Sequence, residues 1–414
     1  MSKKILYSTY DNSPKTQQIV ARLLENNQVK MHLDGLLGSS FSFVIRSIFK
    51  KAELPFLVVL NNKEEAAYYL NDLEQMIGDQ DVLFYPGSFR RPYQIEETDN
   101  ANVLLRAEVL NRINSRKKPA VIVTYPEALF EKVVTRKELD KNTLKVAVGD
   151  KISIDFINEV LFEYEFKRVD FITEPGEFSV RGGIVDVFSF SNDNPYRIEF
   201  FGNEVESIRS FDVATQLSLE TQKKITIIPN VENKFFQENR ESFLDYISEK
   251  TVIFIQNTEN LLSELDKQFG KAEEAFEKLA KEIKHATPEQ LFLNQASFIK
   301  RALDFSVVEW GSKPIFRTTK KFEFHIQPQP SFNKQFDLLL NNLNENHFNG
   351  YKNYLFCSND AQAKRFHDIF ETLDEANSEN IRKQYNTIVL PLYQGFIDEE
   401  NQITCYTDHQ IFER

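Results

Sequence analysis

Two hydrophobic periods alternate along residues 14–130. Some stretches repeat apolar residues at helical spacing, and short unbroken apolar runs, typical of buried strands, lie between them. The expected helices are 16–25, 42–51, 63–75 and 100–114, and the expected strands are 29–33, 55–60, 81–85 and 120–124. Strands that alternate with helices predict a parallel sheet covered by helices, which binds ligands at the carboxyl ends of its strands.

The pattern changes near Val146. One helix is expected at 155–164, and closely spaced short strands follow it. Those strands are 168–171, 177–180, 183–190, 196–201 and 205–211. Pro-Gly and Gly-Asn pairs between them mark turns. Short strands joined by turns predict a small, mainly antiparallel α+β domain.

Helix and strand alternate again from residue 235 onwards. A strand at 251–255 precedes a charged stretch, 259–284, whose apolar residues have the spacing of an amphipathic surface helix. After Pro330 the pattern predicts a small α/β unit. Its expected helices are 333–343 and 360–373, and its expected strands are 351–357, 387–390 and 402–406.

The segment after the first expected strand has the position of a phosphate-binding loop. Gly35 and Gly38 would let backbone N–H groups wrap a phosphate, and Ser42 offers the hydroxyl that such loops give to magnesium. The lysine position holds Phe41, whose ring cannot neutralise a triphosphate. Two glycines alone fit an ordinary strand-to-helix turn. We therefore expect a loop that no longer binds nucleotide, and no nucleotide cofactor.

The acidic charge argues against tight, autonomous binding to nucleic acid. The chain of 414 residues has a net charge of −12, whereas a protein that grips phosphates needs a dense basic surface. Small basic clusters at 90–91 and 116–118 are best explained as solvated loops. The two cysteines, Cys357 and Cys405, lie beside apolar residues and are interpreted as reduced core residues. Without a membrane-spanning run or a signal-peptide core, a cytoplasmic protein is expected.

No local motif of the sequence offers catalysis or a metal site. The six histidines are scattered and lack the spacing of metal ligands. The one acidic run that resembles a metal-binding box, 397–401, is interpreted as a solvated turn before the last strand. The pairs Asp408/His409 and Glu163/Glu165 are explained better by surface charge and strand alternation. We therefore expect neither a catalytic residue nor a bound metal.

The expected strand 196–201 carries an aromatic residue on its polar face. Alternation directs Ile198 and Phe200 towards the core, and Arg197 and Phe201 towards the opposite face. Arginine and aromatic side chains are typical anchors of protein interfaces. A neighbouring loop could equally cover Phe201, so the strand by itself leaves both interpretations open.

The block 174–212 is the most distinctive part of the sequence. It contains Glu-Pro-Gly-Glu-Phe-Ser-Val-Arg-Gly-Gly-Ile-Val-Asp-Val-Phe and Tyr-Arg-Ile-Glu-Phe-Phe-Gly-Asn-Glu. This block closely resembles the domain shared by the excinuclease protein UvrB and bacterial transcription-repair coupling factors. Weaker resemblance extends over essentially the whole chain, including the loop at Gly35, residues 124–129 and residues 404–414.

Two losses make the chain more similar to the coupling factors than to UvrB. UvrB has an intact phosphate loop, whereas this chain has Phe41 in place of the lysine. UvrB also inserts a long hairpin that clamps DNA, and the interval 85–101 is too short for one. The coupling factors share both losses in their UvrB-like amino-terminal module.

The resemblance implies partners and a docking site. In the family, the antiparallel domain docks the damage-recognition protein UvrA, and two arginines and a phenylalanine of that surface match Arg181, Arg197 and Phe201. It also implies a carboxy-terminal regulatory domain that masks this surface, an RNA-polymerase-binding domain and an ATP-driven DNA translocase, all absent here. We therefore expect this chain to recruit UvrA without hydrolysing ATP, while the absent domains bind ATP, RNA polymerase and DNA.

The expected fold class is α/β and multi-domain. Its units are the first part of a degenerate phosphate-loop (RecA-like) parallel-sheet domain at 1–143, an antiparallel α+β UvrA-binding domain at 144–228, the second part of the split domain at 229–328, and a small α/β domain at 329–414. Two alternatives remain. One is a divergent UvrB-like ATPase or damaged-DNA-binding component of the excinuclease, and the other is a DNA-binding module that uses Arg90, Arg91 and Lys117.

Overall fold

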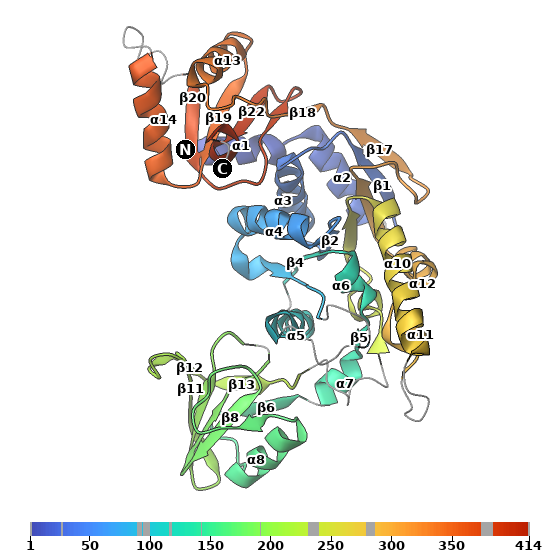
Figure 1. Cartoon of the computed structure of the whole chain (residues 1–414), viewed down its shortest axis with the longest axis vertical. Coiled ribbons are helices and arrows are strands. Elements are labelled where there is room, and N and C mark those ends of the chain that lie inside the picture. Colours follow the sequence, from blue (N-terminus) through green and yellow to red (C-terminus); the bar gives the residue numbers. More distant parts are fainter. Residues whose placement is uncertain are drawn as a thin grey trace.

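The chain folds into three units, seen in Figure 1 as a small α/β unit at one end, a parallel-sheet domain in the middle and an antiparallel unit at the other end. The computed structural model describes residues 2–25, 28–88, 93, 100–115, 118–141, 143–190, 192–230, 240–278, 286–373 and 384–412. Within these ranges, no helix combines the length and apolar character needed to cross a membrane.

Seven strands form the central sheet, in the order β17-β1-β16-β15-β2-β4-β3. Four precede the antiparallel unit in sequence: β1 (Lys30–Asp34), β2 (Phe56–Val59), β3 (Val82–Phe84) and β4 (Val121–Thr124). Three follow it: β15 (Val252–Ile255), β16 (Ser306–Trp310) and β17 (Lys320–Glu323). Every neighbouring pair is parallel. The predicted parallel sheet, interrupted in sequence by an antiparallel unit, is therefore confirmed.

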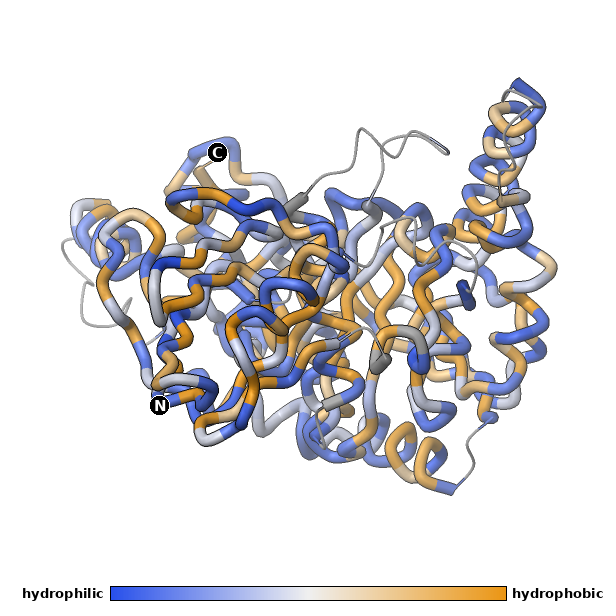
Figure 2. Tube along the Cα trace, turned by 90° about the horizontal axis from the view of Figure 1, so that it is seen from below, coloured by the Kyte–Doolittle hydropathy of each residue, from blue (hydrophilic) through white to orange (hydrophobic). Residues whose placement is uncertain are grey.

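Helices cover both faces of this sheet. The helices α2, α3 and α4 pack together on one face, and α6, α10 and α12 pack together on the other (Figure 1). Figure 2 shows the result as apolar strands in the interior and hydrophilic residues along the outer helices. The helices of this domain are α1 (Ser2–Asp11), α2 (Pro14–Glu25), α3 (Ser40–Ala52), α4 (Lys63–Ile77), α5 (Asn100–Ser115), α6 (Pro126–Phe130), α7 (Arg136–Lys141), α9 (Phe243–Tyr246), α10 (Thr258–Glu277), α11 (Pro288–Leu291) and α12 (Gln295–Ala302).

Local sequence signals start several of these helices where the structure has them. The side chain of Asn62 accepts a hydrogen bond from the backbone of Glu65 at the start of α4, and Asn257 does the same for α10. Such caps satisfy N–H groups that have no partner within the helix. Shorter elements complete the domain: the 3-10 turn η1 (Asp79–Asp81) and the strand pair β5 (Val133–Val134) and β14 (Arg240–Glu241).

The antiparallel unit is joined to the central domain by a two-stranded ribbon, β6 (Leu144–Ala147) and β13 (Lys224–Ile227). Its sheet has the order β12-β11-β10-β9-β8-β7. Those strands are β7 (Lys167–Arg168), β8 (Glu177–Arg181), β9 (Ile184–Val187), β10 (Tyr196–Phe201), β11 (Glu204–Phe211) and β12 (Ser218–Gln222). Helix α8 (Ile154–Glu163) packs on one face, where Phe162 contacts Phe178 edge-on. The ribbon and β12 were not predicted from the sequence.

The last unit has a mixed sheet in the order β18-β21-β22-β19-β20. Its strands are β18 (Ile326–Pro328), β19 (Lys352–Cys357), β20 (Tyr385–Val389), β21 (Phe396–Asp398) and β22 (Ile403–Thr407), and its helices are α13 (Phe336–Phe348), α14 (Asp360–Leu373) and α16 (Asp408–Phe412). Because β18 pairs with β21, the predicted boundary between residues 328 and 329 is wrong by at least one strand. The unit begins by Ile326.

The interpretation of 397–401 as a solvated turn is wrong for Asp398. This residue ends β21 and is buried. It accepts hydrogen bonds from the hydroxyl of Tyr10 at 2.8 Å and from the backbone N–H of Asn401 at 3.0 Å. Tyr10 lies on α1, so the carboxylate ties the amino-terminal helix to the last unit. Neighbouring Glu400 is ion-paired with Lys15.

Candidate functional site

The outer face of the antiparallel sheet, opposite α8, carries a row of polar residues across its strands. Ser179 of β8 pairs with Asp186 of β9, Asp186 pairs with Arg197 of β10, and Arg197 pairs with Arg209 of β11. Side chains that oppose one another in this way lie on the same face and interact directly. We call this face, with the loop 168–171 at its edge, the outer sheet face.

Asp186 organises the two predicted arginines. Its carboxylate is buried and receives two hydrogen bonds from Arg197, Nε to Oδ1 at 2.7 Å and Nη2 to Oδ2 at 2.8 Å. Arg181 binds the same Oδ2 through Nη2 at 2.5 Å. The hydrogen bond to Asp186 is the main cause that raises the pKa of Arg197. Two arginines share one carboxylate, so the cluster keeps one net positive charge.

Phe201 projects from this face into solvent. The exposed fraction of Phe201 is 79%, whereas its neighbour Phe200 is buried. The register between β10 and β11 shifts between Glu199 and Phe200, where β11 has one extra residue, Glu206. No loop covers the ring in the described structure, which decides the question that alternation left open.

A second exposed aromatic residue lies on the same face and was missed in the sequence. The exposed fraction of Phe171 is 65%, and the guanidinium of Arg181 lies 5.4 Å from the centre of its ring. Between Arg168, Phe171 and Arg181 the surface has a cavity of about 450 Å³. Exposed aromatic rings beside a partly exposed arginine are the composition of interface anchors.

Glu199 and Arg209 form a second charged pair on the outer sheet face. Arg209 is hydrogen-bonded to the Glu199 carboxylate, which also accepts a hydrogen bond from the Ser207 hydroxyl at 2.6 Å. The Ser207 bond, and then Arg209, hold the pKa of Glu199 below its ordinary value. Acidic side chains therefore fix the arginines of this face in place, and a partner would meet preformed geometry.

Of the four residues named for the phosphate-loop position, Phe41 and Ser42 lie in the core, whereas Gly35 is exposed and Gly38 is half-buried. Phe41 is fully buried and stacks on Trp310, with ring centres 3.7 Å apart. Gly35 has a φ of +84°, and a Cβ there would lie 2.1 Å from the carbonyl oxygen of Phe324. The hydroxyl of Ser42 donates to Asp72 at 3.2 Å. The structure thus places these residues in packing roles.

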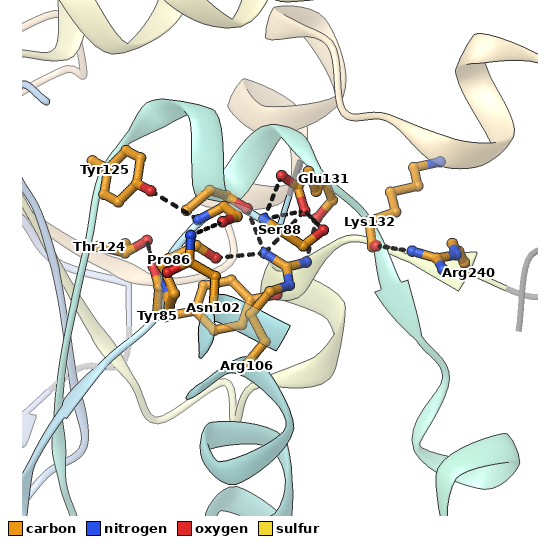
Figure 3. Close-up of polar contacts among 12 residues, drawn as sticks. Tyr85, Pro86, Ser88, Asn102, Arg106, Thr124, Tyr125, Glu131, Lys132 and Arg240 are labelled. Atoms are coloured by element: carbon orange, nitrogen blue, oxygen red, sulfur yellow. Dashed lines mark hydrogen bonds and ion pairs between the residues drawn. The ribbon is translucent and has the colours of Figure 1, made fainter. Parts of the chain in front are cut away.

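A buried ion pair lies near the carboxyl ends of β3 and β4 (Figure 3). Arg106 of α5 is fully buried and lies 3.4 Å from the equally buried carboxylate of Glu131. Arg106 also donates to the carbonyl of Pro86 at 2.9 Å. Glu131 accepts the backbone N–H of Ser88 at 2.8 Å and its hydroxyl at 2.6 Å. This cluster satisfies its own hydrogen bonds and therefore fastens the segment that follows β3.

The residues named for the DNA-binding alternative cannot be placed. Arg90, Arg91 and Lys117 lie outside the described residues, as does most of the interval 85–101. Among the residues that the structure does describe, no group of three or more His, Cys, Asp or Glu side chains is arranged to hold a metal ion.

The antiparallel unit matches a known domain family. Residues 144–233 match the family described as the UvrB interaction domain. The chain is 33% identical over 198 residues to the transcription-repair-coupling factor of Bacillus subtilis, covering 48% of this chain and 17% of that protein. It is 30% identical over 204 residues to that of Rickettsia bellii, covering 49% and 18%.

UvrABC system protein B is a more distant relative. The chain is 27% identical over 278 residues to that protein from Thermotoga petrophila, covering 64% of this chain and 41% of the relative. Over about half its length, the chain is therefore homologous to the amino-terminal region of transcription-repair coupling factors. It spans less than a fifth of the length of the coupling factors just named.

Proposed function

We propose that this UvrB-like region docks UvrA on the outer sheet face, and so recruits it to stalled RNA polymerase in transcription-coupled nucleotide excision repair. The observation that carries the proposal is the 79% exposure of Phe201 beside the Arg181–Asp186–Arg197 cluster, within a UvrB interaction domain. An exposed aromatic ring gains little free energy when the chain folds, but it gains free energy when a partner buries it.

The three predicted residues would have different parts in such docking. Phe201 supplies apolar area, and Arg181 offers the donors that Asp186 leaves free. The side chain of Arg197 is only 19% exposed and is hydrogen-bonded to both oxygens of the Asp186 carboxylate. Its replacement would leave a buried carboxylate with one partner, so it would disturb the sheet as well as the surface.

Phe201→Ala is expected to weaken UvrA binding about 30-fold, because losing an aromatic anchor costs about 2 kcal/mol. The measurement is the Kd for purified UvrA by titration calorimetry or interferometry. Phe348→Ala is the matched control, since Phe348 is 90% exposed but lies on α13 in the last unit. Equal affinities for the wild type and Phe201→Ala, with binding still saturable, would place the docking site elsewhere.

We also propose that this chain has no ATPase activity of its own. Phe41 occupies the lysine position and stacks on Trp310, so a phenyl ring stands where an intact loop has its ammonium group. Titration with ATP and magnesium to millimolar concentration is expected to give no saturable binding by calorimetry. Saturable binding that competes with ADP would favour the divergent UvrB-like ATPase instead.

A further inference from the structure

A segment of the last unit lies across the degenerate loop. The backbone N–H of Ser39 donates to the carbonyl of Gln394 at 3.1 Å, and the N–H of Gln394 donates to the Ser39 hydroxyl oxygen at 3.0 Å. This reciprocal pair joins residues that are 355 positions apart in the sequence. It lies at the amino end of α3, where a phosphate loop would present its N–H groups.

Asp72 adds a second polar contact beside the first. It lies on α4 and is fully buried, and its Oδ1 accepts the backbone N–H of Tyr393 at 2.8 Å. The other oxygen, Oδ2, accepts the hydroxyl of Ser42 at 3.2 Å. One carboxylate therefore links the helix after the loop to the segment from the last unit.

Aromatic side chains close over the same contact. The ring of Tyr393 stacks on Tyr68, with centres 4.2 Å apart, and meets Tyr69 edge-on at 5.8 Å. The hydroxyl of Tyr69 donates to the carbonyl of Gly38 at 3.2 Å. Asn71 donates to the carbonyl of Pro391 at 3.3 Å. The loop, α4 and residues 391–395 thus share one contact.

Gly38 is required for the close approach of the two segments. Its φ is +52°, and a Cβ there would lie 3.0 Å from the Cβ of Gln394 and 3.3 Å from its carbonyl oxygen. A side chain at this position would be strained by the backbone conformation and would push the segment away. The close approach of Gln394 therefore accounts for a glycine at position 38 without a bound nucleotide.

We propose that the former phosphate loop is the receptor of an intramolecular clasp, in which the main chain of residues 391–395 occupies the place of a bound phosphate. The carbonyl oxygen of Gln394 carries partial negative charge and accepts an N–H at the positive end of α3, which is the preference that phosphate satisfies in intact loops. The clasp fixes the last unit on the parallel-sheet domain and blocks the loop to nucleotide, in addition to the loss of the lysine.

Hydrogen exchange in the whole chain tests the clasp directly. The amides of Tyr393 and Gln394 are expected to be protected in the wild type, and Gly38→Val to speed their exchange at least about tenfold. Exchange in β2 and β19 should stay slow, which separates opening of the clasp from unfolding. Gly78→Val is the matched control, because Gly78 also has positive φ, at +120°, but a Cβ there meets nothing within 4 Å.

A milder variant keeps the test valid if Gly38→Val does not fold. Tyr68 is partly exposed and contacts Tyr393 by stacking, so Tyr68→Ala is expected to speed exchange at Tyr393 and Gln394 about fivefold. UvrA affinity should not change, since the outer sheet face lies at the other end of the molecule (Figure 1). Fast exchange at Tyr393 and Gln394 in the wild type, or equal effects of the two glycine variants, would overturn the clasp.

Discussion

Glu131→Ala is expected to destabilise the parallel-sheet domain by roughly 3–5 kcal/mol, because it removes one partner of a buried ion pair. The guanidinium of Arg106 would remain in the core without a carboxylate. The N–H and hydroxyl of Ser88 would lose their acceptor as well. Removing both charges leaves no buried charge unpaired, so Arg106→Met with Glu131→Ala should cost less than the sum of the two single variants.

The measurement is urea unfolding followed by the fluorescence of Trp310, which is the single tryptophan and lies in β16 of the same sheet. Glu273→Ala is the matched control, since Glu273 is exposed on α10. A loss below about 1 kcal/mol for Glu131→Ala, in the range of exposed ion pairs, would mean that the pair is solvated in solution.

The sequence predicts this fold where local pattern decides it. Unbroken apolar runs become strands buried on both faces, as at β2 and β15, because a covered parallel sheet leaves no polar side. Alternation along β10 also predicts correctly that Phe200 and Phe201 lie on opposite faces. These features depend on neighbours in the sequence, so periodicity is enough to find them.

Features that depend on strand register could not be found in this way. Asp186 looks out of place in an apolar strand, and only its pairing with Arg197 explains it. The signal in the sequence was an aspartate within an apolar stretch, followed by a strand that carries an arginine. The burial of Asp398 and the pairing of β18 were not predicted either, because the partners of both are distant in the sequence. Tyr10 is 388 residues from Asp398, and β18 pairs with β21.

The segment between β1 and α3 has the position of a phosphate loop, while Phe41 within it packs in the core. Its lysine position now holds a ring that packs on Trp310, and Ser39 at the start of α3 now binds Gln394. Both contacts use a strand-to-helix turn whose backbone N–H groups point away from the helix. Phe41 at the lysine position is visible in the sequence, but residues 391–395 come from a distant segment and leave no local pattern.

Asp72→Asn is expected to remove a decline in stability between about pH 4 and pH 7. Burial raises the pKa of Asp72 from 3.8 to about 7, although hydrogen bonds from Ser39, Tyr393 and Ser42 oppose the shift. The folded state therefore holds the proton more tightly than the unfolded state. The contribution of Asp72 to wild-type stability should fall as the pH rises through this window, by up to about 4 kcal/mol, and stay constant above it.

The two tyrosines that face Asp72 do not titrate in this pH window. Burial raises the pKa values of Tyr69 and Tyr393 above their ordinary value of 10.0, so both hydroxyls stay neutral. The asparagine introduced by Asp72→Asn keeps an oxygen that can accept the Tyr393 N–H, so any loss from the substitution itself is the same at each pH. The measurement is urea unfolding of both proteins at several pH values from about 4.5 to 7.5, with Asp266→Asn on α10 as control. If the difference in unfolding free energy between the wild type and Asp72→Asn is the same at every pH, Asp72 is ionised throughout and the clasp holds a charged carboxylate.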